Sequence, residues 1–164
     1  MKKKSVLCRL IFNILIKGMS GVAKYDNEIK EELGVLGDGY KVKLGIFPHS
    51  DYARFVVKDN RVYKTKVEDC DIEILFKNLK VAKKVLLGRM SIAEAFSMHS
   101  IVLKGNINDA LVLVRIMERT EDYLFPKWYT KAINRKKKNV SSLKIYLWLL
   151  FGCNRPKKEK KHGK

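Results

Sequence analysis

The sequence has few of the residues from which metal sites and disulfide frameworks are built. It contains three cysteines, Cys8, Cys70 and Cys153, and three scattered histidines. There is no Cys-x-x-Cys pair and no cysteine–histidine cluster with the spacing of a metal site. We therefore expect free thiols in a reducing cytoplasm, with no bound metal and no cofactor.

Sequence motifs of catalysis are also missing. The chain lacks a Gly-x-Ser-x-Gly elbow, a phosphate-binding loop and a zinc-binding helix motif. His99 falls where the chain leaves a predicted helix for a predicted strand, which favours a solvated or capping histidine over a general base. The acidic run from Glu68 to Glu73 lacks the glycine and the regular ligand positions of a calcium loop. We predict that the protein is not an enzyme.

No run of 18 uninterrupted apolar residues occurs, so a membrane-spanning helix is not expected. The basic start and apolar middle of residues 1–24 are similar to a secretory signal, which is one interpretation. Arg9 interrupts the apolar run, however, and apolar residues recur at helical spacing at Leu7, Ile11, Ile14 and Leu15. We therefore predict a basic amphipathic helix over residues 1–24, with a cleaved signal as the alternative.

Positive charge is concentrated at the two ends of the chain. The formal net charge is +18, yet residues 1–24 hold six Lys/Arg and no acid, and residues 127–164 hold thirteen Lys/Arg and one acid. The middle, residues 25–126, is left with equal numbers of basic and acidic groups. Since a nucleic-acid-binding domain usually carries its basic patch on the folded body, nucleic acid is not the expected partner.

Between the charged ends, the hydrophobic pattern predicts alternating elements. Alternation indicates strands over 40–46, 53–57, 61–66, 72–76 and near 101–103, with a tight turn at 58–60. Helical spacing and capping residues indicate helices over 27–33, 79–86, from 91 onward and 107–125. This order predicts an α+β fold of two layers. Its five-stranded, mainly antiparallel sheet has one face covered by helices and the other in water.

The segment from Gly88 to Leu113 carries the clearest local signals. Ser91 with Glu94 forms a capping box at the start of one helix, and Asn106 with Asp109 repeats the device at the next. An apolar strand centred on residues 101–103 lies between the two helix starts. The segment contains packing signals and no chemical motif, which favours a cavity over a reaction.

This segment resembles the sterol carrier protein type-2 sterol-binding domain family, in its small stand-alone bacterial form. The family's pattern runs from a helix through a Gly-Lys/Arg-Met/Leu turn, an Ala–Phe pair and an apolar strand to a Gly-Asn/Asp helix start. The matching positions are Gly88, Arg89, Met90, Ser91, Ala95, Phe96, Ile101, Leu103, Gly105, Asn106 and Ala110. The likeness extends over about residues 70–115 and less closely over the domain at 25–126.

The resemblance implies an apolar tunnel between the sheet and the helices that holds a sterol, fatty acyl or isoprenoid lipid without catalysis. Methionines suit the irregular wall of such a tunnel. The side chains expected to line it are Phe76, Leu79, Val85, Leu86, Met90, Phe96, Met98, Ile101, Leu103, Leu111, Val114 and Met117.

The tail, residues 127–164, contains a short apolar helix near 141–152 with basic clusters on both sides. That helix is apolar nearly all round, so it needs a partner: the domain's own surface, a second chain or a lipid interface. Basic flanks with interfacial aromatics favour an anionic membrane surface. The predicted docking residues are Trp128, Lys136, Lys137, Lys138, Trp148 and Phe151.

These observations predict a lipid-binding protein that is cytoplasmic or peripheral at a membrane. Two alternatives stay open at this point: a basic protein associated with nucleic acid, and an accessory subunit that presents a lipid to an enzyme. The sequence does not indicate an oligomeric state.

Overall fold

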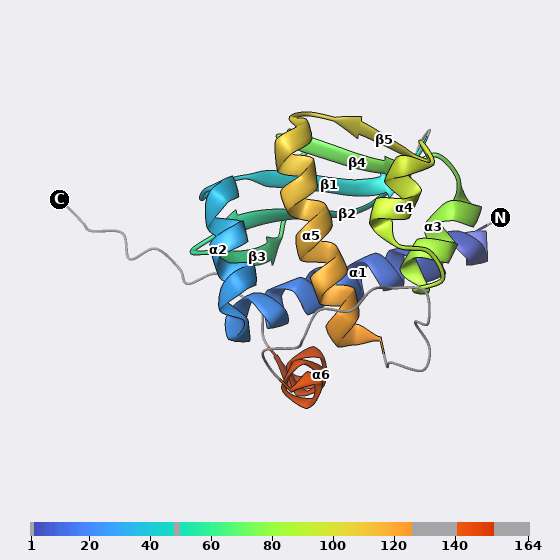
Figure 1. The fold of residues 1–164 in the computed structure, drawn as a ribbon. Coiled ribbons are helices and arrows are strands. Elements are labelled where there is room, and N and C mark those ends of the chain that lie inside the picture. Colours follow the sequence, from blue (N-terminus) through green and yellow to red (C-terminus); the bar gives the residue numbers. More distant parts are fainter. Residues whose placement is uncertain (1, 48–49, 126–140, 153–164) are drawn as a thin grey trace.

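The computed structural model describes residues 2–47, 50–125 and 141–152 (Figure 1). Its elements in chain order are α1 (Lys2–Tyr25), α2 (Asn27–Leu36), β1 (Lys41–Ile46), β2 (Ser50–Lys58), β3 (Arg61–Lys64), β4 (Ile72–Phe76), α3 (Leu79–Leu86), α4 (Ile92–Ser97), β5 (Ile101–Lys104), α5 (Ile107–Leu124) and α6 (Ser142–Phe151). The predicted α+β fold is confirmed.

The five strands form one sheet in the order β3-β2-β1-β4-β5. Three neighbouring pairs are antiparallel, and β1 and β4 run parallel, so the sheet is mainly antiparallel as predicted. The register places Phe76 of β4 between Ile46 of β1 and Ile101 of β5. The centroid of the Phe76 ring lies 6.1 Å from the ring centroid of Phe12 in α1.

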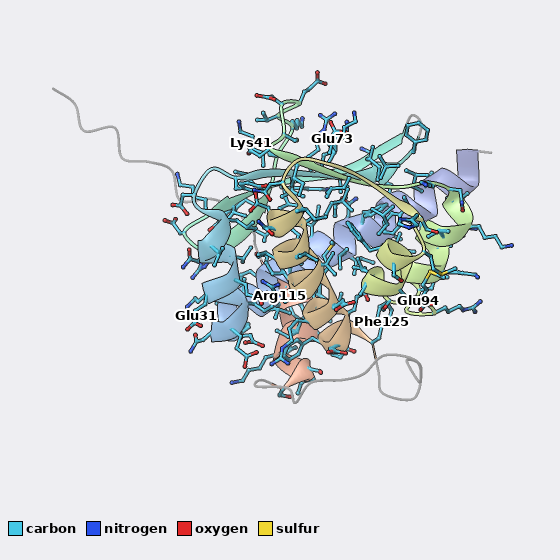
Figure 2. All side chains as sticks on the ribbon, turned by 45° about the horizontal axis from the view of Figure 1, so that its top comes forward. Glu31, Lys41, Glu73, Glu94, Arg115 and Phe125 are labelled. Carbon is cyan, nitrogen blue, oxygen red and sulfur yellow. The ribbon has the colours of Figure 1, made fainter. Side chains whose placement is uncertain are left out.

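The two faces of the sheet differ in polarity because side chains alternate along each strand. Val42 and Leu44 are buried beneath the helices. On the other face Glu73 lies between two lysines, with Lys43 Nζ at 3.3 Å and Lys104 Nζ at 3.4 Å from its carboxylate. Figure 2 shows Lys41 and Glu73 on this outer side. Within the described residues, the helices therefore cover one face of the sheet only.

Local signals in the sequence match the backbone closely. Asp59 and Asn60 adopt φ values of 51° and 53° in the β2–β3 turn, as two-residue hairpin turns require. The Ser91 hydroxyl accepts a hydrogen bond from the Glu94 amide at 2.9 Å. Gly105 has φ 123°, and a Cβ atom there would lie 2.8 Å from the Asp71 carbonyl oxygen. Only glycine fits this bend between β5 and α5.

The second predicted capping pair works differently from the expectation. The Asn106 side chain accepts from the Asn108 amide at 2.8 Å, which caps α5. The Asp109 carboxylate accepts a 2.7 Å hydrogen bond from the Tyr40 hydroxyl, next to β1. Asp109 therefore ties the start of α5 to the sheet.

Helix α1 is part of the core. The side chains of Phe12, Met19 and Val22 are buried against the sheet and α5. Of the predicted apolar face, Leu15 is buried and Ile11 packs partly buried against the core, whereas Ile14 is 42% exposed, so the buried face overlaps only part of the predicted one. Because both sides of α1 are apolar, spacing alone could not tell which one faces the core.

A buried polar cluster fixes α5 to the turn between α1 and α2. Asp26 caps α2 by accepting from the Glu28 amide at 3.1 Å. Its other oxygen accepts from Tyr123 Oη at 2.8 Å and from Arg119 Nε at 3.3 Å. Since a buried carboxylate is stable only when paired and hydrogen-bonded, these contacts hold the C-terminal half of α5 in one position.

Candidate functional site

The residues predicted to line a tunnel come from the sheet, α3, α4 and α5, and most of them meet in the core between sheet and helices. Six are buried: Phe76, Val85, Leu86, Met90, Val114 and Met117. Leu79, Phe96, Ile101 and Leu103 are partly buried. Met98 and Leu111 are 58% and 47% exposed and lie on the surface. Among these twelve side chains, Leu86 also lines the pocket described next.

An apolar pocket of about 250 Å³ lies where α1, α5 and α6 meet the end of α3. Figure 1 shows α6 below α1 and the end of α5, on the side of the molecule away from β5. The lining residues are Ile11, Ile14, Leu15, Leu86, Leu87, Glu121, Leu124, Phe125, Tyr146 and Leu149. All but Glu121 and Tyr146 are aliphatic or phenyl side chains, so the pocket suits an apolar ligand.

Helix α6 forms one wall of this pocket and is held by two polar contacts at its rim. The Tyr146 hydroxyl donates a 2.8 Å hydrogen bond to the carbonyl oxygen of Leu124, at the end of α5. Lys17 Nζ of α1 donates to the carbonyl oxygen of Leu149 at 2.6 Å. Ile145, next to Tyr146 in the sequence, is fully buried. The inner side of α6 therefore packs on the chain's own domain.

Close packing of α6 on α1 depends on a small residue. Gly21 lies against the Trp148 indole, with its Cβ position 3.1 Å from Cγ of that ring. Lys24 Nζ lies 4.4 Å from the centroid of the same ring, a cation–π contact. Trp148 is thus half-buried between α1 and solvent.

Glu121 is the one acidic side chain among the described residues that line the pocket. It is 2% exposed, and its Oε2 atom has no hydrogen-bond partner among the described residues. Burial, reinforced by the nearby carboxylates of Glu118 and Asp122, raises the pKa of Glu121 well above its usual value. The carboxyl group therefore favours its protonated form, which donates as well as accepts a hydrogen bond.

The outer sides of α1 and α6 carry exposed apolar residues beside the pocket. On α1 these are Val6, Leu10 and Ile14, at spacings of four residues. We call them the α1 stripe; Ile14 belongs to both the stripe and the pocket wall. On α6 the exposed residues are Leu143, Leu147, Leu150 and Phe151, which we call the α6 face.

Of the predicted docking residues, two lie within the part of the chain that the structure describes. Phe151 is 82% exposed at the end of α6, and it lines a surface hollow of about 550 Å³ together with Trp148, Tyr25 and Lys144. Trp128 and Lys136, Lys137 and Lys138 fall outside the described residues.

Two further observations bear on the kind of site. Within residues 2–47, 50–125 and 141–152, no three His, Cys, Asp or Glu side chains gather as metal ligands would. In the same ranges, no helix combines the length and apolarity needed to cross a bilayer.

Sequence reasoning missed Glu121 and the role of α6 in the pocket. A signal for Glu121 exists, because it follows Val114 and Met117 at helical spacing on the buried side of α5. An acid at a core position of an amphipathic helix is unusual and marks a position that packing alone does not explain.

No family model matches the sequence, and no curated protein matches it. The chain is similar to a solved UbiJ-SCP2 ubiquinone synthesis protein, at 13% identity over 63% of this chain and 84% of that one, with a TM-score of 0.46. It is also similar to sterol carrier protein 2 from Yarrowia lipolytica in its apo form (16% identity, 66% and 87% of the two chains, TM-score 0.42) and to the sterol carrier protein domain 2 of Helicoverpa armigera (14%, 77% and 92%, TM-score 0.45). These solved structures are sterol carrier protein 2 domains, the family that the Gly88–Leu113 segment resembles.

Proposed function

We propose that the protein binds an apolar lipid, without catalysis, in the pocket between α1, α3, α5 and α6. The observation that carries this proposal is the pocket wall, in which eight of ten lining residues are wholly hydrocarbon and the one acid is deeply buried. Each methylene that enters contributes about 0.8 kcal/mol, so a chain of moderate length binds usefully without a polar motif.

The size of the pocket limits what lies inside it. Ligand pockets usually measure roughly 300–1,000 Å³, and this one measures about 250 Å³. It therefore takes one segment of a lipid. The remainder of a longer ligand would pass the rim that α6 makes with the end of α5.

We propose further that the α1 stripe and the α6 face dock the protein to an anionic membrane surface. Ile14 of the α1 stripe lines the pocket, and α6 lines it through Leu149, the neighbour in sequence of Leu150 in the α6 face. The sequence on either side of α6 is rich in lysine and arginine, and each such residue near an anionic leaflet contributes about 1 kcal/mol. A lipid could then pass between bilayer and pocket without crossing water.

Lipid extraction tests the binding proposal directly. The full chain is purified under native conditions, extracted with organic solvent and analysed by mass spectrometry, and binding of a pyrene-labelled fatty alcohol is titrated in parallel. We expect a co-purifying apolar lipid and saturable probe binding. Absence of both would refute the proposal.

A matched pair of variants places the ligand in the pocket. Leu87→Lys puts a charge into the pocket wall, whereas Ile107→Lys puts one on an exposed position at the far end of α5. Probe binding should fall at least tenfold in Leu87→Lys and stay unchanged in Ile107→Lys. A retarded DNA or RNA band with a steep salt dependence, in a protein that binds no probe, would favour the nucleic-acid alternative.

A further inference from the structure

Glu121 is the feature of the pocket that an apolar ligand alone does not explain. A buried polar atom without a partner is costly, and the fold supplies none for its Oε2 among the described residues. The buried acid Asp26 is treated differently. The carboxylate of Asp26 accepts three hydrogen bonds from Glu28, Arg119 and Tyr123.

The position of Glu121 on α5 places its side chain with the pocket wall. Leu124 and Phe125 follow it by three and four residues, so the three side chains share one face of the helix end. All three line the pocket, with Leu86 and Leu87 contributed by the end of α3. Figure 2 shows Phe125 where α5 ends. The carboxyl group is thus the one acidic group in a mainly hydrocarbon wall, and the other polar side chain there, Tyr146, already donates its hydroxyl to the Leu124 carbonyl oxygen.

The charges around Glu121 limit what it can bind. The described part of the chain shows no lysine, arginine or histidine in an ion pair with it, and the nearest influences are the carboxyls of Glu118 and Asp122. Lys17 of α1, which does not line the pocket, donates to the Leu149 carbonyl oxygen. An anionic head group would meet further negative charge here. A neutral oxygen function would meet a carboxyl group able to donate or accept.

We propose that Glu121 hydrogen-bonds the head group of the bound lipid, and that this ligand carries an uncharged oxygen function, a hydroxyl or a carbonyl, at the end that enters the pocket. The inference rests on the proposed lipid-binding function and makes Glu121 its specificity-determining residue. A site built to hydrogen-bond an oxygen group rejects a ligand that lacks one, because its own polar group is then left without a partner.

Competition between ligands of one chain length tests this. Decan-1-ol, decane, decanoate and decylamine are each titrated against the pyrene-labelled fatty alcohol on the full chain. We expect decan-1-ol to bind about tenfold more tightly than decane, the effect of one hydrogen bond to a buried group. Decanoate should bind more weakly than the alcohol. Tightest binding of decylamine would overturn the proposal, because it would show an ionised carboxylate acting as a counter-ion.

Variants at residue 121 separate this inference from the function on which it rests. Glu121→Leu should bind decane at least as tightly as the parent does but bind decan-1-ol and the probe, itself an alcohol, more weakly, so that the preference for the alcohol is lost. Glu121→Gln, which retains hydrogen bonding, should keep that preference within about threefold. Glu121→Met serves if the leucine variant does not fold.

If the parent binds the probe and decane but the preference for the alcohol is absent or unaffected by Glu121→Leu, the inference is wrong and the lipid site stands. If the parent binds no probe and no decane, both fail.

Discussion

Gly21 of α1 lies directly beneath the indole ring of Trp148 of α6, so closely that any Cβ atom at residue 21 would collide with Cδ1 of the ring. The two residues are far apart in the sequence, yet their contact sets how near α6 approaches the pocket. Gly21 lies within α1, so its lack of a side chain is needed for the close approach of α6 and not for a backbone turn.

Gly21→Val should therefore move α6 away from α1 and open the pocket. We expect amide hydrogen exchange of residues 142–151 to accelerate at least tenfold, because α6 loses its close packing on α1 while the rest of the core is unchanged. Gly34→Val is the matched control: it lies in α2, where a Cβ atom meets only Asn60 at an ordinary 3.4 Å. Equal exchange of α6 in both variants would contradict this account of how α6 packs on α1.

Removing the carboxylate of Asp26 should destabilise the whole domain. Asp26→Ala removes the buried charge partner of Arg119, leaves it only the exposed Glu28 carboxylate at 3.4 Å, and uncaps α2, which we expect to cost about 3–5 kcal/mol in urea unfolding. Tyr123→Phe removes one of the same hydrogen bonds and should cost about 1 kcal/mol.

An exposed ion pair provides the comparison for Asp26. Glu32 accepts from Arg115 Nε at 2.9 Å on the surface between α2 and α5. Glu32→Ala should cost about 0–1 kcal/mol, since exposed pairs contribute little. A loss below 1 kcal/mol for Asp26→Ala would mean that the buried cluster does not anchor α5.

Glu121 should make folding weaken as the pH rises. Its pKa is raised in the folded state, so the native protein holds a proton that the unfolded chain releases above its usual pKa of 4.5. Below that pH both states are protonated and the group has no effect. Above it, stability falls with a slope of up to about 1.4 kcal/mol per pH unit, until the folded group also ionises.

Glu121→Gln should abolish this dependence. The variant should be more stable than the parent at pH 8 and equal to it near pH 4, as measured by urea unfolding across that range. Glu31→Gln makes the same change in charge at an exposed position on α2 and should leave the slope of the parent intact. A parent slope that survives in Glu121→Gln would contradict deep burial of this carboxyl.

The sheet could be predicted from the sequence because its signals are local. Alternating residues, the Asp59–Asn60 turn and the caps at Ser91 and Asn106 each involve neighbours within a few positions. The parallel pairing of β1 with β4 was not specified by such signals, and neither was the face that α1 buries. Those depend on packing between segments that are distant in the chain.

The pocket could not be predicted for the same reason. It depends on α6, and the Lys17–Leu149 contact that holds this helix joins residues 132 positions apart. An apolar helix of ten residues left three partners open: the domain, a second chain or a lipid interface. Ile145 shows that its inner side packs on the domain, while the exposed α6 face is still available to one of the other two.

Docking to membranes is best tested on that exposed face. Truncation of the tail would remove Tyr146 and Leu149 from the pocket wall, so it would disturb lipid binding as well. Phe151→Asp changes a side chain that is 82% exposed and lies outside the pocket. Burial of a phenylalanine in the interface contributes about 1.5–3 kcal/mol, so vesicle binding should fall at least tenfold.

The measurement is co-sedimentation with vesicles of phosphatidylcholine containing phosphatidylglycerol, compared with phosphatidylcholine alone. Binding of the parent should require the anionic lipid and weaken with salt, because the Lys/Arg-rich flanks act electrostatically. Val35→Asp is the control, since Val35 is 72% exposed on α2 and belongs neither to the pocket wall nor to the α6 face. If both variants sediment like the parent while the pyrene probe still binds, the protein takes up its lipid without docking through α6. If instead the parent forms a dimer that Phe151→Asp abolishes, the α6 face binds a second copy of the chain.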